Sequence, residues 1–75
     1  MQASPDLPAA RAYVARTRAA LVVRYNGMLP RRNGYAFYFT VLSRGARAAF
    51  VVKLCEDRLG RVTGSSNASY GEPSC

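Results

Sequence analysis

The chain lacks histidine and tryptophan, and its 75 residues include one lysine, two cysteines and four acidic residues. A serine nucleophile without histidine would need Lys53 as its base, but no glycine-rich turn precedes a serine near this lysine. Two cysteines do not complete a zinc site, which normally takes four Cys or His ligands. The adjacent Glu56 and Asp57 are interpreted as solvated or turn-capping acids. We therefore expect no enzymatic activity, no metal and no cofactor.

Long apolar runs are also absent, so no membrane-spanning helix is expected, because such a helix needs roughly 18 apolar residues. The start of the chain is polar and does not resemble a signal peptide. The stretch Gln2-Ala3-Ser4-Pro5 instead resembles the first residues after a small-residue cleavage site. This pattern favours an exported bacterial protein in the periplasm over a cytoplasmic one.

The cysteines, Cys55 and Cys75, lack the C-x-x-C spacing of redox motifs. In an oxidising compartment they would form a disulfide that ties the end of the chain to the end of a strand. Two inert thiols are the alternative, and the sequence leaves both open.

Ten arginines and one lysine face four acids, which gives a net charge of +7. Such a charge attracts nucleic acid, anionic lipid or an acidic protein. The arginines are spread along the chain, with Arg31-Arg32 the only adjacent pair. This spread is typical of a solvated surface, so a polyanionic partner is a hypothesis.

Two runs rich in aromatic and β-branched residues, 35–42 and 47–55, predict a hairpin folded about Arg44-Gly45. This register pairs Val41 with Ala48, Phe39 with Phe50, Phe37 with Val52 and Tyr35 with Leu54. Because side chains alternate along a strand, these eight share one apolar face. The opposite, mixed face would carry Ala36, Tyr38, Thr40 and Leu42 with Lys53, Val51, Ala49 and Arg47.

Helical signals precede the hairpin. Ser4 is the expected N-cap, with Pro5 in the first helical position and Asp6 near the positive helix end. Apolar residues recur at helical spacing from Leu7 onward, which predicts a helix from about residue 5 to 20–25, or one that ends near 20 with 21–25 extended. Asn26-Gly27 is expected to end this segment in a turn.

We therefore predict an α+β domain over residues 1–64, with a flexible tail over 65–75. The helix would pack on a three-stranded antiparallel meander of 34–42, 47–55 and 60–64. The predicted core is Leu7, Ala10, Val14, Leu21, Phe37, Phe39, Val41, Phe50, Val52, Leu54 and Val62. Strand 34–42 would lie at the sheet edge, where 21–25 would cap it or a second strand would pair with it.

A non-catalytic interaction module follows from this architecture. It would bind a protein partner, or a second copy of itself, through the sheet edge or through the mixed face. The candidate surface residues on that face are Tyr38, Leu42 and Val51.

The stretch Gly34-Tyr35-Ala36-Phe37 resembles the core of the signature strand of the RNA recognition motif. The resemblance implies an alternative function, binding of single-stranded nucleic acid. Tyr35 and Phe37 would then stack on bases, and Arg31 and Arg32 would contact phosphates. That family also requires a helix over 43–54, a segment that we predict to be mainly strand.

Overall fold

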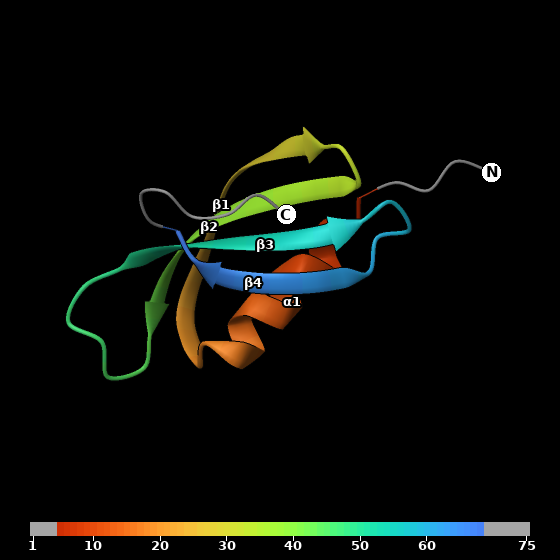
Figure 1. Ribbon diagram of the computed structural model, residues 1–75. Helices are drawn as coiled ribbons and strands as arrows, with labels where there is room; N and C mark the ends of the chain where they lie inside the picture. The colour runs from red at the N-terminus through yellow and green to blue at the C-terminus, as the bar shows by residue number, and fades with distance from the viewer. Residues whose placement is uncertain (1–4, 69–75) are drawn as a thin grey trace.

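The computed structural model describes residues 5–68 and shows one helix followed by an antiparallel sheet (Figure 1). The elements are α1 (Leu7–Thr17), β1 (Ala20–Arg31), β2 (Gly34–Ser43), β3 (Phe50–Asp57) and β4 (Val62–Asn67). The sheet order is β1-β2-β3-β4, so each strand pairs with its neighbour in the sequence. The α+β class and the antiparallel sheet are confirmed, but the sheet has a fourth strand that was not predicted.

The helix begins and ends inside its predicted bounds. Its N-cap is Asp6, whose carboxylate accepts a hydrogen bond from the Ala9 N–H at 3.0 Å, and Pro8 lies in the first turn. The predicted cap, Ser4, lies outside the described residues. The helix ends at Thr17, and Ala19 adopts a positive φ of 47°, which directs the chain into β1.

The unpredicted strand, β1, runs through the expected turn at Asn26-Gly27. A shift in register between Tyr25 and Gly27 leaves one extra residue there, so the turn signal is accommodated as a β-bulge. The strand continues to Arg31, which pairs with Gly34 across a two-residue turn. Strand β2 is therefore interior, and its predicted edge is capped by β1.

The register between β2 and β3 differs from the prediction by two residues. Phe39 lies opposite Val52 and Val41 opposite Phe50, so the predicted pairing of Phe39 with Phe50 is wrong. Both aromatic residues keep their predicted face, because a shift of two residues preserves side-chain alternation. The shift lengthens the connecting loop, whose residues 44–49 are all exposed.

The core lies between α1 and one face of the sheet. Its buried members are Ala10, Val14, Phe37, Phe39, Val41, Val52 and Leu54, with Leu7, Phe50 and Val62 packed against them. Leu21 was predicted to be in the core, but its residue surface is 58% exposed, and it lies at an irregularity in register near the start of β1. Strand β4 extends to Asn67, so residues 65–67 belong to the sheet and not to a tail. Within residues 5–68, no helix is long and apolar enough to cross a membrane.

Candidate interaction face

The sheet face that points away from α1 carries the candidate surface. Phe37, Phe39 and Val41 face the helix, and alternation directs Tyr38 and Leu42 to the opposite side. Val51 lies there too, because it pairs with Thr40. The three predicted surface residues therefore share one face, on which Val51 is exposed and the other two are half-buried.

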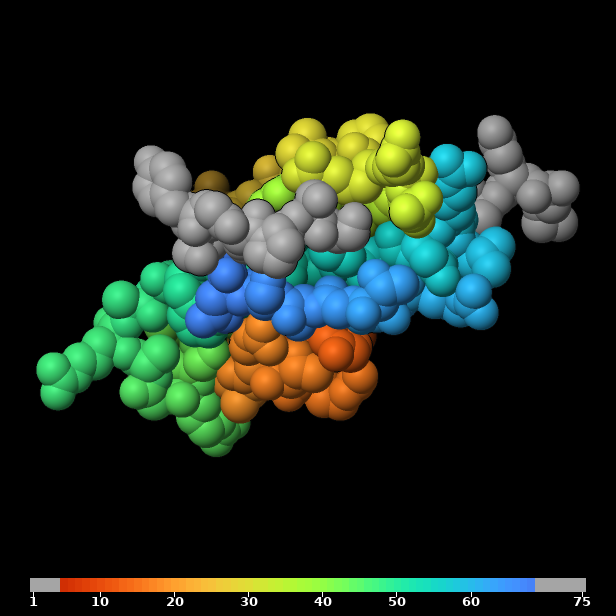
Figure 2. Space-filling model, in the orientation of Figure 1, coloured from red at the N-terminus to blue at the C-terminus, as the bar shows by residue number. Residues whose placement is uncertain are grey.

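Strand β1 adds side chains to this face that the sequence reasoning did not identify. In the observed register, Val22 lies beside Leu42, Arg24 beside Thr40 and Leu29 beside Ala36, and Arg31 follows Leu29 by two positions. Val22, Arg24, Leu29 and Arg31 are all exposed, and we call them the β1 strip. Figure 2 shows the second half of β1, in yellow, as a ridge along one side of the molecule. In the sequence, the adjacent apolar residues Val22 and Val23 obscure the alternation of apolar and polar residues that is typical of a strand. The strip is therefore evident only once β1 is known to be a strand.

Over β1 and β2, hydrogen bonds join described side chains of this face in two places. The Asn26 side chain, at the β-bulge, donates from Nδ2 to Thr40 Oγ1 at 2.7 Å. Arg31 donates from Nη2 to the Tyr38 hydroxyl at 3.2 Å. Arg24 forms no hydrogen bond or ion pair with another described residue. Its guanidinium group is therefore available to an external acceptor.

The part of this face over β3 is less accessible. Lys53 lies opposite Tyr38 and is only 4% exposed, and the neighbouring Cys55 lies opposite Ala36 and is also buried. The accessible part therefore lies over β1 and around Val51. Cys75 lies outside the described residues, so the disulfide between Cys55 and Cys75 stays a prediction.

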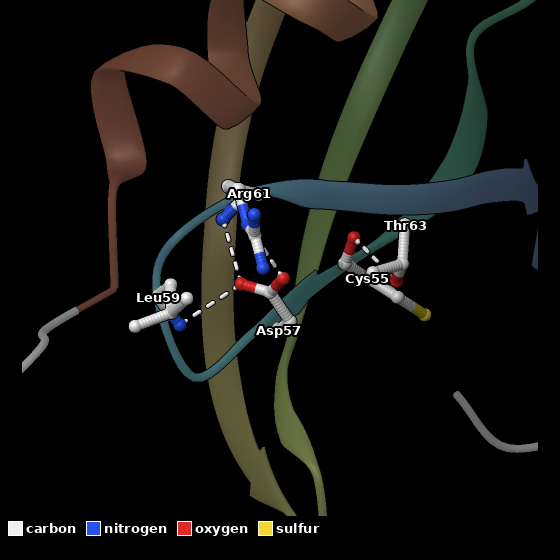
Figure 3. A network of polar contacts seen from close by, with 5 residues as sticks. All are labelled: Cys55, Asp57, Leu59, Arg61 and Thr63. Carbon is white, nitrogen blue, oxygen red and sulfur yellow. Dashed lines mark hydrogen bonds and ion pairs between the residues drawn. The ribbon is translucent and has the colours of Figure 1, made fainter.

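The described carboxylates are all engaged away from the β1 strip. Asp6 caps α1, and Glu56 is buried on the helix side, where burial raises its pKa. Asp57 accepts hydrogen bonds from the backbone N–H groups of Arg61 (3.0 Å) and Leu59 (2.9 Å) and forms an ion pair with Arg61 Nε at 3.0 Å (Figure 3). These contacts, the Arg61 backbone bond foremost, lower the pKa of Asp57.

In the same view, Thr63 Oγ1 donates to the Cys55 carbonyl at 3.2 Å and joins β4 to β3 (Figure 3). The network of Asp57 and Thr63 thus fixes the β3–β4 turn. It offers no unengaged carboxylate to a partner.

The outer edge of β1 is poorly suited to pairing with another strand. Arg11 of α1 donates from Nη2 to the Val23 carbonyl at 2.8 Å, so this edge group already has a partner. The bulge at Asn26 interrupts the regular spacing of backbone groups, and Pro30 has no N–H to donate. Bulges, prolines and charged side chains are common protections of edge strands. The face is therefore the better docking surface than this edge.

The four candidate nucleic-acid contacts do not come together on one surface. Phe37 is 1% exposed and packs in the core, with its ring centroid 6.4 Å from those of Phe39 and Tyr25. Tyr35 is half-buried against the same core. Arg31 lies on the opposite face. Arg32 is exposed in the β1–β2 turn, where its carbonyl accepts from Arg58.

The RNA recognition motif also requires a helix over residues 43–54, and the structure has none there. Residues 43–54 form the end of β2, a loop and the start of β3 instead of a helix. The predicted strand in this segment is therefore confirmed, although it begins at Phe50 and not at residue 47.

No protein-family model, curated protein or solved structure matches this chain.

Proposed function

We propose that this chain is a small, basic, non-catalytic binding module that docks a partner protein on the sheet face opposite α1. The observation that carries the proposal is the β1 strip, in which apolar Val22 and Leu29 are exposed beside Arg24 and Arg31. Leu42 and Val51 extend its apolar part across the sheet. Arginine and apolar side chains together are characteristic of binding surfaces, whereas an isolated exposed leucine is not informative.

The two kinds of side chain would make different contributions. Burying an exposed valine or leucine completely stabilises a complex by about 1.5–3 kcal/mol, before the costs of association. The arginines would add mainly orientation and a faster encounter with an oppositely charged partner. The hydrogen-bonded sheet beneath them is already ordered, so these side chains are presented without a large ordering cost.

A non-catalytic role is supported by the positions of the groups that could act as acids or bases. Lys53 and Glu56 are buried on opposite faces of the sheet, and Asp57 is held within the β3–β4 turn. These groups do not converge on one exposed point. As part of this proposal we also retain an exported, periplasmic location, in which Cys55 and Cys75 would form a disulfide.

Photo-crosslinking in cells that naturally produce the protein tests this function. A benzophenone amino acid would replace Leu29 on the strip or, as the control, Ala12 on the exposed side of α1. We expect a discrete protein adduct from position 29 that is absent from position 12. Equal adducts from both positions, or none from position 29, would contradict the proposed face. An adduct from position 29 whose mobility shift disappears after nuclease treatment would support nucleic-acid binding instead.

A further inference from the structure

We infer that the partner presents an extended acidic segment that lies along β1 and places two carboxylates on Arg24 and Arg31. This inference rests on the proposed function, because it names the class of partner for the same face. Three features support it: the charge of the face, the spacing of the two arginines and the apolar side chains beside them.

The charge of the face is unbalanced. The chain carries a net charge of +7, and the three carboxylates within residues 5–68, those of Asp6, Glu56 and Asp57, are engaged by the helix cap, the core and the β3–β4 turn. Arg24 has no hydrogen-bond or ion-pair partner among the described residues. Arg31 contacts the uncharged Tyr38 hydroxyl. Neither guanidinium group has a negatively charged partner among the described residues. A carboxylate of the ligand would supply one, and its two oxygens match the planar donor geometry of arginine.

The spacing of the arginines defines the form of the ligand. Arg31 follows Arg24 by seven positions in the sequence, but one of these positions is the extra residue of the bulge. Six strand steps of about 3.3 Å place the two Cα atoms roughly 20 Å apart along the strand. An extended ligand therefore needs acidic residues about six positions apart. Because six is even, both would point to the same side of the ligand.

The apolar members of the strip define what lies between the acids. Leu29 lies between the two arginines, and Val22 with Leu42 continues the surface beyond Arg24. Alternate apolar residues of the ligand would cover Leu29 while its acidic residues reach the arginines. Such a ligand combines apolar burial with charge complementarity, as binding surfaces with central apolar and peripheral charged groups do.

A second copy of this chain does not fit the same face. Two copies related by a twofold axis present identical patches to each other, so Arg24 and Arg31 would meet arginines and no carboxylate. Like charges in such a contact are unfavourable. The protections along the outer edge of β1 likewise act against strand pairing between copies.

The inference is tested with fluorescein-labelled synthetic peptides and fluorescence anisotropy. One peptide carries two glutamates six positions apart with valine and leucine between them, and its control has the same composition with the glutamates adjacent. We expect tighter binding of the spaced peptide, and weaker binding as salt rises from about 50 to 500 mM because screening becomes stronger. Equal affinities of the two peptides would contradict the proposed spacing of six positions between the acidic residues.

Charge-reversal variants test whether Arg24 and Arg31 are the residues that bind the acidic peptide. Arg24→Glu and Arg31→Glu should each weaken binding of the spaced peptide by about five- to tenfold, since an attractive pair becomes repulsive. Arg47→Glu is the matched control: it changes the net charge equally, but it lies in the exposed 44–49 loop, which projects from one end of the molecule in Figure 2. A loss as large in Arg47→Glu would show that only the net charge matters. Circular dichroism should show that all three variants are folded.

Two outcomes separate this inference from the proposed function. If position 29 crosslinks a protein but no acidic peptide binds, the acidic partner is wrong and the docking face stands. If short single-stranded RNA displaces the spaced peptide and binds more tightly at the same salt concentration, the partner is a nucleic acid and both proposals fail.

Discussion

The side-chain carboxylate of Glu56 accepts a hydrogen bond at 2.8 Å from the backbone N–H of Asp6, 50 positions earlier in the chain. The bond connects the end of β3 to the residue that caps α1. Glu56 is only 2% exposed, and its second oxygen, Oε2, has no hydrogen-bond partner among residues 5–68. Burial is the main cause that raises the pKa of Glu56, and the charges of Asp6 and Asp57 add to it, while the Asp6 bond opposes it.

Glu56→Gln should remove a pH-dependent loss of stability. A carboxyl group whose pKa is raised in the folded state favours folding at acidic pH, and this contribution disappears as the pH rises through the folded-state pKa. The free energy of unfolding of the natural protein, relative to the variant, should therefore fall as the pH rises from about 4 to 7. Urea unfolding of both proteins at several pH values measures this difference. A constant difference would contradict the raised pKa.

Asp57→Asn serves as the control with the opposite sign. The pKa of Asp57 is lowered, chiefly by the backbone hydrogen bond from Arg61, so its contribution to folding is present near neutral pH. That contribution should be lost as the pH falls below about 4. The variant should therefore lack this acidic loss, and its response should not resemble that of Glu56→Gln.

Gly34→Ala should destabilise the fold. Gly34 has a φ of 156°, and a Cβ built on it would collide with the backbone carbonyl of Glu56. Relief of that collision requires a backbone shift between β2 and β3, for which we expect a cost of about 1–3 kcal/mol. Gly64→Ala is the control, because a Cβ there meets open space. Thermal and urea unfolding of the two variants should differ clearly, and equal stabilities would contradict the close contact.

Leucine-to-alanine substitutions should distinguish the core from β1. Leu54 is fully buried, so Leu54→Ala should lower the free energy of unfolding by about 2–5 kcal/mol. Leu21 is largely exposed, and Leu21→Ala should change it by no more than about 0.5 kcal/mol. Urea denaturation measures both. If Leu54→Ala does not fold while Leu21→Ala does, the two sites are still distinguished. Equal losses of stability in the two variants would instead place Leu21 in the core.

Protein isolated from an oxidising compartment should contain no free thiol after unfolding without reductant. The predicted bond between Cys55 and Cys75 closes a loop of about 20 residues, which stabilises folding by about 3 kcal/mol in the chain-entropy description. Thiol titration before and after reduction counts the groups, and Cys75→Ser is the matched variant for stability. Two reactive thiols without reductant would show that the pairing is wrong.

The sequence alone determined which side chains of the hairpin lie on the core side. Strict alternation places Phe37 and Phe39 on one face of β2, and Val52 and Leu54 follow the same rule on β3. The sequence did not determine the register, because a shift of two residues preserves both faces and changes only the loop. In the folded chain Val52 lies opposite Phe39 and is fully buried in the cluster that includes Ala10 and Val14 of α1, whereas Phe50 is partly buried against that cluster.

The tertiary structure decided what local preference could not. Asn26-Gly27 favours a turn in isolation, yet hydrogen bonding of β1 to β2 on both sides of it makes the pair a bulge. Glutamate is usually exposed, but Glu56 is buried and accepts a hydrogen bond from the N–H of Asp6, which only folding brings beside it. The β1 strip has the same origin: Arg24, Leu29 and Arg31 are separated by several residues, and they form one surface only because β1 is a strand. Local patterns set side-chain alternation, whereas contacts between distant segments decide which turn signals are overridden and which polar groups meet.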